Sequence, residues 1–215
     1  METETKKEQN LVYTLEGKIY VNLTNMCTNR CVFCIRNLKN DVEGKNLFLA
    51  SEDFSADDVI EQFENVRKKL PNAKETVFCG YGEPLIKFDL FETVASKIKE
   101  LYPEMKIRVN TNGQANLIHK TDVTERLAKV ADAVSISLNA DNTENYNKIS
   151  VPADKENSYD AVKEFIKLCV ERGIETSASV VSEYPGFDVN VAACENIAKS
   201  LGADFRNRKW LPAGY

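Results

Sequence analysis

Segments typical of strands and of helices alternate along almost the whole sequence, and this alternation limits the folds open to the chain. Five segments place apolar residues at helical spacing, as Val59, Phe63 and Val66 do, and short β-branched and apolar runs lie between them. Short connections between such segments call for parallel strands with right-handed crossovers, so we predict an α/β fold. The predicted helices span about 55–70, 87–101, 122–130, 157–172 and 188–201, and the predicted strands lie near Thr76–Cys79, Lys106–Asn110, Ala133–Leu138, Glu175–Val181 and Asp204–Arg208.

The N-terminal part adds a predicted β-hairpin. Leu11–Leu15 and Lys18–Thr24 read as its two strands, with Glu16-Gly17 as the turn, and the second strand brings the predicted parallel strands to six. Periodicity alone does not distinguish a curved sheet from a flat, doubly wound one. No linker rich in Pro, Gly or Ser divides the chain, so we expect one domain over residues 11–215 behind a disordered tail over residues 1–10.

Composition fits a soluble protein with a sizeable core. The 215 residues are 43% hydrophobic, and no apolar run is long enough to cross a bilayer. The charged N-terminus does not resemble a secretory signal, so we expect a cytoplasmic protein without a membrane partner. The net charge of −5, from 28 basic and 33 acidic residues, gives no overall field that favours nucleic acid, although it leaves room for a local basic patch.

Three cysteines are clustered with the spacing Cys-x3-Cys-x2-Cys, at Cys27, Cys31 and Cys34. A zinc site or a common iron–sulfur cluster normally takes four protein ligands, so three suggest a cluster with one open iron. A zinc knuckle or a chance cluster of buried cysteines is the alternative. The remaining cysteines lie on apparent core segments and are expected to pack as small apolar residues in a reducing compartment: Cys79, Cys169 and Cys194.

With Phe33 directly before the third cysteine, the motif resembles the cluster motif of the radical S-adenosylmethionine (radical SAM) enzymes. The resemblance implies a [4Fe-4S] cluster held by the three cysteines, which are then the catalytic and metal-binding residues, and SAM bound at the fourth iron. Electron transfer to SAM would release a 5′-deoxyadenosyl radical that abstracts hydrogen from a substrate. The cluster would be oxygen-sensitive, and Phe33 would adjoin the cofactors. The implied fold is a partial (β/α)6 TIM-type barrel, open at the side, with an N-terminal β-hairpin.

A second motif supports the same resemblance. Val77–Leu85 reads as a strand end followed by a turn in which Gly82, Glu83 and Pro84 match the family's Gly-Glu-Pro sequence. The resemblance implies that this turn presents backbone carbonyls and a carboxylate to the amino group of SAM. Tyr81 departs from the first glycine of the family pattern, but a backbone acceptor does not require glycine there. By itself, such a turn would be a common loop.

Two further strand ends carry polar residues. Asn112, in Val109–Gly113, resembles residues that line the SAM cavity in the family, and an ordinary Asn-Gly turn is the alternative. Ser137 and Asn139 end the segment Val134–Asn139, and the resemblance implies contacts with the methionine carboxylate or ribose of SAM. Serines in strands are also often satisfied structurally.

Most of the chain resembles a small radical SAM family associated with TatD-type metal-dependent hydrolases, for which we know of no defined substrate. The implied partners are an unidentified substrate (small molecule, peptide or nucleic acid) and an external electron donor such as flavodoxin or ferredoxin. An alternative function is a cluster- and SAM-binding accessory or maturation protein without its own carbon substrate. Substrate contacts are expected among residues at strand ends and at the open edge: Arg36, Asn37, Gln114, His119, Arg206, Arg208 and Trp210. The residues expected to converge at the unclosed edge between the first and last strands are Phe205, Arg206, Arg208 and Trp210.

Overall fold

The computed structural model describes residues 9–39 and 41–211. Most of the predicted disordered tail, residues 1–8, therefore lies outside the described residues. Of its last two residues, Gln9 accepts a hydrogen bond from Ser51 N (3.1 Å) and Asn10 donates one to Asn46 O (2.8 Å).

The main sheet has seven strands in the order β1-β2-β5-β6-β7-β8-β9. β1 and β2 form the predicted antiparallel hairpin, and every other neighbouring pair is parallel, which gives the six predicted parallel strands. Within the described chain β1 and β9 remain the two edges, so the barrel is partial and the predicted fold class is confirmed. The strands are β1 (Val12–Leu15), β2 (Lys18–Val21), β5 (Glu75–Phe78), β6 (Lys106–Thr111), β7 (Ala133–Ser137), β8 (Glu175–Ser182) and β9 (Asp204–Lys209).

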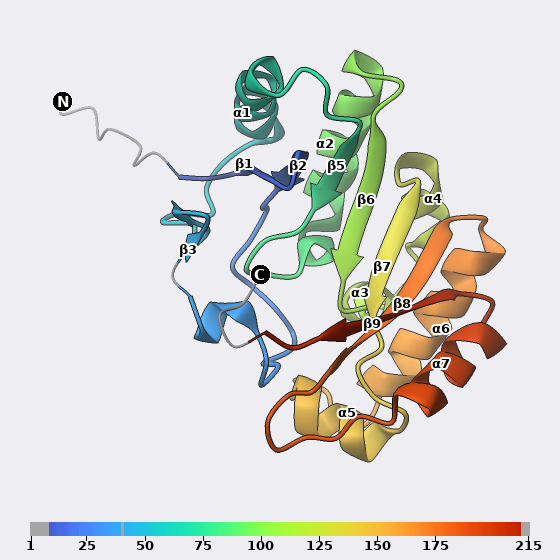
Figure 1. The fold of residues 1–215 in the computed structure, drawn as a ribbon. Coiled ribbons are helices and arrows are strands. Elements are labelled where there is room, and N and C mark those ends of the chain that lie inside the picture. Colours follow the sequence, from blue (N-terminus) through green and yellow to red (C-terminus); the bar gives the residue numbers. More distant parts are fainter. Residues whose placement is uncertain (1–8, 40, 212–215) are drawn as a thin grey trace.

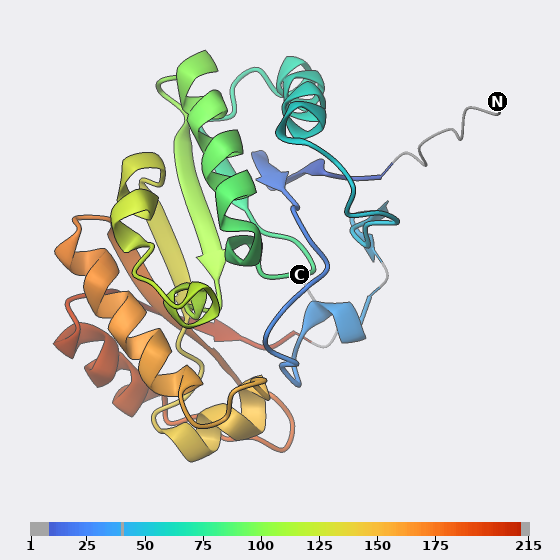
Figure 2. The ribbon, with the colours of Figure 1, turned by 180° about the vertical axis from the view of Figure 1, so that it is seen from behind.

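Helices cover one face of this sheet and leave the other concave and open. Figure 2 shows α2, α4, α6 and α7 in front of the strands, whereas Figure 1 looks onto the opposite, concave face. Between sheet and helices lies an apolar core in which Phe78 of β5 meets Phe91 of α2 edge to face at 4.7 Å. The predicted helices appear as α1 (Ala56–Lys69), α2 (Phe88–Leu101), α4 (Thr124–Val130), α6 (Ser158–Glu171) and α7 (Val191–Ser200).

The start of α1 illustrates how the sequence sets these helices. Ser55 caps the helix by accepting from Asp58 N, while the Asp58 carboxylate accepts from Ser55 N, which is a reciprocal capping box. Val59 and Phe63 then fall on the buried face. Fully burying a side chain of this size contributes about 1.5–3 kcal/mol, so the apolar stripe fixes which face meets the sheet.

Several short elements were not predicted, because each offers too few residues for a periodic signal. They are the hairpin of β3 (Asp41–Val42) and β4 (Lys45–Asn46), the 3-10 turns η1 (Ile35–Asn37) and η2 (Pro84–Lys87), and the helices α3 (Ala115–His119) and α5 (Thr143–Ser150). The prediction that Phe205 converges with Arg206 and Arg208 was also wrong, because Phe205 packs against the helix-side core and successive strand residues point to opposite faces.

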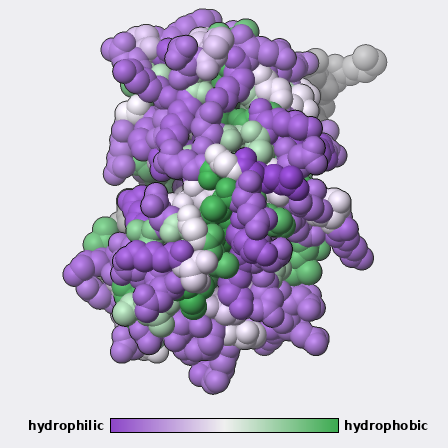
Figure 3. Space-filling model, turned by 90° about the vertical axis from the view of Figure 1, so that its right-hand side faces the viewer, coloured by the Kyte–Doolittle hydropathy of each residue, from purple (hydrophilic) through white to green (hydrophobic). Residues whose placement is uncertain are grey.

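The exterior is largely polar. Figure 3 shows a mostly hydrophilic face, on which hydrophobic residues gather mainly near the middle. No helix in the described ranges combines the length and apolar character that a transmembrane span needs. Cys169 and Cys194 are fully buried on α6 and α7, as expected for small core residues, whereas Cys79 is only partly buried.

Candidate functional site

The three clustered cysteines lie on the segment that follows β2, at the end of the sheet where the parallel strands finish. In Figure 1 this blue segment runs down beside β5 and β6 and ends close to α5. Cys27, Cys31 and Cys34 are all partly buried. An open cavity of about 660 Å³ adjoins the segment, and its lining includes Cys27 and Cys34. We call residues 22–34 the cysteine loop.

One side of the cysteine loop is held by Glu52. Its carboxylate accepts hydrogen bonds from Thr24 Oγ1 (2.9 Å) and Asn25 N (2.7 Å), and it forms an ion pair with Lys87 Nζ (2.9 Å). Asn25 also exchanges two hydrogen bonds with the backbone of Leu49. These contacts fix the start of the loop before the first cysteine.

The other side of the loop is bonded to the end of α5. Arg30 N donates to the carbonyl oxygens of Ser150 and Val151 (both 3.1 Å), and Val32 N donates to Ile149 O (3.0 Å). Val151 has a left-handed backbone (φ 44°), which is strained for a β-branched residue. Because this strained turn supplies an acceptor to the residue between two cysteines, α5 acts as a support for the loop.

A buried polar triangle links the loop to two further elements. Gln114 Nε2 donates to Asn29 Oδ1 (2.8 Å) and to Tyr146 Oη (3.0 Å), and Asn29 Nδ2 donates to the same hydroxyl (3.2 Å). All three residues are almost completely buried. Asn29 lies between Cys27 and Cys31, so this triangle positions the centre of the motif. The sequence prediction placed Gln114 near substrate and missed Asn29 and Tyr146.

The turn after β5 makes a close approach to the cysteine loop. A Cβ atom on Gly82 would lie 2.3 Å from Thr24 O and 2.5 Å from Met26 O, so no larger residue fits without a shift of the backbone. The next residue, Glu83, donates its N–H to Met26 O (2.7 Å). Pro84 follows as the first residue of η2. The predicted Gly-Glu-Pro turn is thereby clamped directly beside Cys27.

Glu83 is 3% exposed, and both oxygens of its carboxylate accept hydrogen bonds within the protein. It accepts from Thr111 Oγ1 (2.8 Å), Leu85 N (3.1 Å) and Asn112 N (2.6 Å). Burial raises the pKa of Glu83 to about 7, although these hydrogen bonds act in the opposite direction. A cation that approached this carboxylate would favour its ionised form.

Asn112 connects the end of β6 to the cysteine loop. Its Nδ2 donates to Thr28 Oγ1 (2.8 Å) and lies 3.9 Å from Cys27 Sγ, while its Oδ1 accepts from Gln114 N (3.0 Å). The residue is therefore more than a turn former, since its amide bridges two segments of the candidate site.

Asn139 and Ser137 lie at the end of β7. Asn139 has a left-handed backbone (φ 62°) and is 1% exposed; its Nδ2 donates to Ser150 Oγ (3.0 Å). Its Oδ1 is buried and accepts no hydrogen bond from the described residues. Ser137 is half-buried and faces the concave side, in register with Ser179. The pair thus offers one unused acceptor and one accessible hydroxyl at the strand ends.

Phe33 packs towards β8 and β9. Its ring meets Tyr184 edge to face (6.3 Å), and Tyr184 in turn meets Trp210 (5.4 Å). Tyr184 Oη donates to Val32 O (3.1 Å). These aromatic residues join the cysteine loop to the segment that directly follows β9 at the open edge.

Arg36 and Asn37 line the same cavity as Cys27 and Cys34, whereas His119 and Tyr81 do not. Arg36 donates to Asn25 O (2.9 Å) and lies over the Phe48 ring, while Asn37 Nδ2 contacts Cys31 O (3.4 Å). His119 ends α3, where its Nε2 lies 2.8 Å from Leu85 O and its ring meets Phe88 edge to face, so it has structural partners. Tyr81 is buried in a small cluster with Val42 and Leu47 and donates to Lys39 O (2.9 Å).

The three cysteine thiols are suitable ligands for a metal cluster, but Cys27 and Cys31 are not ionised in advance, and the three are not already arranged around a common centre. Burial raises the pKa of Cys27 to about 11 and that of Cys31 to about 12. A bound metal reverses this by coordinating thiolate. Within the described parts of the chain, no three His, Cys, Asp or Glu side chains already stand in a metal-holding arrangement. The thiols would have to turn towards a common centre when a cluster binds.

Comparison with known proteins finds a family model that matches most of the chain. The family model for the radical SAM superfamily matches residues 21–201. A dual-specificity RNA methyltransferase, RlmN from Halorhodospira halophila, is 27% identical over 148 residues, which are 66% of this chain and 37% of that protein. The chain spans roughly a third of the length of the curated relatives it matches.

Solved structures share the fold. Streptococcus suis SuiB bound to S-adenosylmethionine superposes with a TM-score of 0.64 at 20% identity, covering 89% of this chain and 40% of SuiB. The radical SAM methyltransferase TsrM from Kitasatospora setae, with cobalamin and a [4Fe-4S] cluster bound, gives a TM-score of 0.56 at 16% identity, covering 88% of this chain and 37% of TsrM.

Proposed function

This chain belongs to the radical SAM superfamily, and from that premise we propose that it is a SAM-cleaving radical enzyme. Cys27, Cys31 and Cys34 would hold a [4Fe-4S] cluster. When bound, cluster and SAM supply reductive cleavage of a carbon–sulfur bond and hence a 5′-deoxyadenosyl radical. The observation that carries the proposal is the clamp between the cysteine loop and the Gly82-Glu83 turn, in which Glu83 N–H bonds to Met26 O at 2.7 Å.

The clamp matters because it brings a buried carboxylate and the cysteines to the same strand ends. Glu83 would accept from the amino group of SAM and offset its positive charge, as charge-assisted hydrogen bonds do. Gly82 would leave room for the close backbone approach, and Pro84 would fix the turn that follows. Asn139, with its unused Oδ1, and Ser137 would bind the polar parts of SAM. Asn112 and Phe33 would keep the cysteine loop in place.

The finer assignment rests on the sequence. We assign the chain to the small family associated with TatD-type hydrolases, and we expect an external electron donor such as flavodoxin or ferredoxin in the cytoplasm. SuiB, which shares the fold, is also solved with its precursor peptide SuiA. A peptide is accordingly one substrate class to test here, beside small molecules and nucleic acids.

Anaerobic reconstitution tests the proposal. Wild-type protein reduced with dithionite should bind about four irons and four sulfides and release 5′-deoxyadenosine from SAM. Replacing Cys27, Cys31 or Cys34 by Ala should abolish that release, whereas the buried control variants Cys169→Ala and Cys194→Ala should retain the cluster absorption. Zinc in place of iron would refute the proposal. A loaded cluster without 5′-deoxyadenosine would instead favour an accessory protein.

A further inference from the structure

Two rows across the concave face of the sheet are polar, although the interior of a barrel of this type is usually packed with branched apolar residues. The pairing register aligns Asn110, Ser135, Ser177 and Asp204 in one row across four strands. Ser137, Ser179 and Arg206 form the next row. Their strand neighbours, such as Ile136 and Ala178, belong to the helix-side core. The concave face is therefore built to meet a polar molecule.

Charges at the amino ends of the strands neutralise one another. Lys18 and Arg108 both pair with Glu75 (2.6 and 2.7 Å), and Lys106 pairs with Glu175 (2.6 Å). Towards the carboxyl ends, where the candidate site lies, the remaining charges on the concave face of β9 are the guanidinium groups of Arg206 and Arg208. The two arginines therefore place positive charge on the part of this face nearer the cysteine loop.

The two arginines have no acidic partner among the described residues. Arg206 is exposed, and neither its side chain nor that of Arg208 forms an ion pair or hydrogen bond there. Arg208 Nε is moreover buried without an acceptor among the described residues, and so is Nε1 of Trp210, which directly follows β9. A buried donor without an acceptor carries a desolvation cost, so both groups call for a ligand oxygen.

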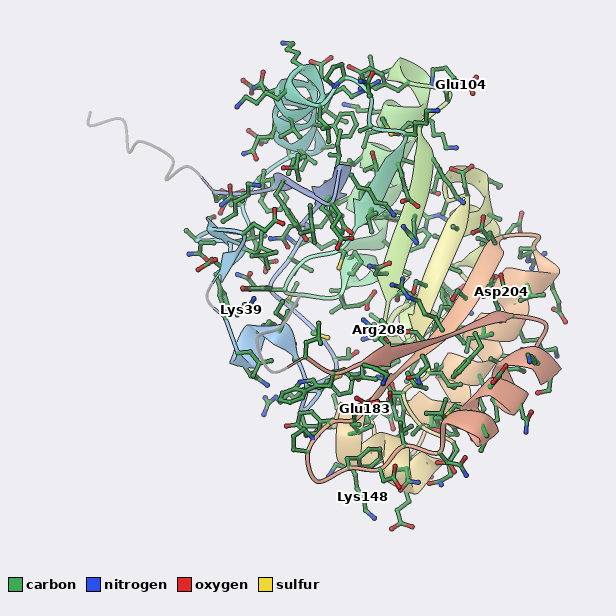
Figure 4. The ribbon with its side chains drawn as sticks, in the orientation of Figure 1. Lys39, Glu104, Lys148, Glu183, Asp204 and Arg208 are labelled. Carbon is green, nitrogen blue, oxygen red and sulfur yellow. The ribbon has the colours of Figure 1, made fainter. Side chains whose placement is uncertain are left out.

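Arg208 points into the concave face. Figure 4 labels it near the centre of the view, on the sheet side of β9, whereas Glu183 lies below the strand. Its charge is felt by the partly exposed Cys79 at the end of β5, although burial remains the main influence on that thiol and raises its pKa. Arg206 lies two strands from Ser137, a separation of about 10 Å from the usual strand spacing.

We infer that Arg206 and Arg208, together with the Trp210 indole N–H, bind an anionic group of the substrate. A guanidinium presents N–H donors in a planar fork that matches phosphate and carboxylate oxygens. The bound group would lie at the open edge of the barrel, beside the residues proposed to hold SAM. This inference rests on the proposed function, because only an enzyme has a substrate. It adds that the substrate carries a phosphate or a carboxylate.

Calorimetry of the reconstituted protein with SAM, at low ionic strength, tests the inference with inorganic phosphate and glutarate as probes. At least one probe should bind the wild type. The probe that binds more tightly identifies whether the site prefers a phosphate or a carboxylate. Arg206→Gln and Arg208→Gln should each weaken that binding at least tenfold. Arg208→Lys should retain only part of the binding affinity, because lysine keeps the positive charge but lacks the planar fork of N–H donors. Arg172→Gln, at the end of α6 on the helix layer, is the matched control and should bind as the wild type does.

Release of 5′-deoxyadenosine with dithionite is measured on the same samples, so the two claims fail separately. Unchanged SAM cleavage together with arginine-dependent binding supports the inference. Binding of neither probe by the wild type overturns it, as does equal weakening in the Arg172→Gln control. If no variant or wild type cleaves SAM but binding still depends on Arg206 and Arg208, the anion site stands and the enzymatic proposal fails.

Discussion

The carboxylate of Glu83 accepts a hydrogen bond of 2.6 Å from the backbone N–H of Asn112, although the two residues follow different strands of the sheet. This bond joins the turn after β5 to the end of β6, and Asn112 continues the connection to Thr28 in the cysteine loop. Three segments of the candidate site are thereby held as one unit.

Replacing Glu83 by Ala should weaken SAM binding by about 10- to 100-fold, because a charge-assisted hydrogen bond contributes roughly 1.5–3 kcal/mol. The iron content should stay as in the wild type, since Glu83 is not a cluster ligand. Calorimetry with SAM measures the affinity. Glu61→Ala on the exposed side of α1 serves as the control. An unchanged affinity in Glu83→Ala would remove this residue from the SAM site.

The cluster-free protein should lose stability as the pH rises from about 4.5 to 7. Burial raises the pKa of Glu83 from 4.5 to about 7, so between these values the folded state holds a proton that the unfolded chain has released. The contribution is fully present below the lower value and is lost above the higher one, with a magnitude on the order of 3 kcal/mol. Urea unfolding of wild type and Glu83→Gln at several pH values should show the dependence only in the wild type. Parallel pH profiles would contradict the prediction.

Gly82→Ala should impair cluster assembly. The added Cβ would overlap the backbone oxygens of Thr24 and Met26, and backbone atoms cannot rotate away as a flexible side chain does. The cysteine loop would have to move, so we expect at least a severalfold lower iron content after reconstitution. Gly17→Ala in the distant hairpin turn, where the Cβ meets nothing within 4 Å, should lower stability through its positive φ but keep the iron. Equal iron in both variants would argue against the clamp.

Tyr146→Phe should destabilise the protein by about 1–3 kcal/mol, because the amides of Asn29 and Gln114 would each lose a buried acceptor. The cysteine loop should also become more susceptible to proteolysis in the cluster-free protein. Chemical unfolding and limited proteolysis measure the two effects. Tyr102→Phe, at the end of α2, is the control, since its hydroxyl makes no hydrogen bond with the described residues. A similar small effect in both variants would show that the triangle adds little.

The sequence predicted the fold well wherever periodicity spans enough residues. Each of the five predicted helices and six predicted parallel strands is present, and the cysteine motif with the Gly-Glu-Pro turn indicated which end of the sheet carries the site. The family model shows that the chain belongs to the radical SAM superfamily, whereas its assignment to the small family associated with TatD-type hydrolases remains a prediction.

The supports of the site could not be read from the sequence in the same way. Tyr146 lies on a short, mostly polar helix, and it meets Asn29 across 117 residues of sequence. Glu52 precedes the first predicted helix without any pattern that links it to Thr24. Such contacts depend on long-range packing, whereas local propensity and spacing carry no information about which distant side chains will meet.

The central claim is that three cysteines leave one iron free for SAM, and pulsed electron paramagnetic resonance tests it most directly. The reduced, reconstituted protein is mixed with SAM that carries ¹⁵N in its amino group. The account predicts a ¹⁵N hyperfine coupling to the cluster in the wild type and in the Cys169→Ala control. A cluster whose spectrum does not change on addition of SAM, or bound SAM without ¹⁵N coupling, would contradict it.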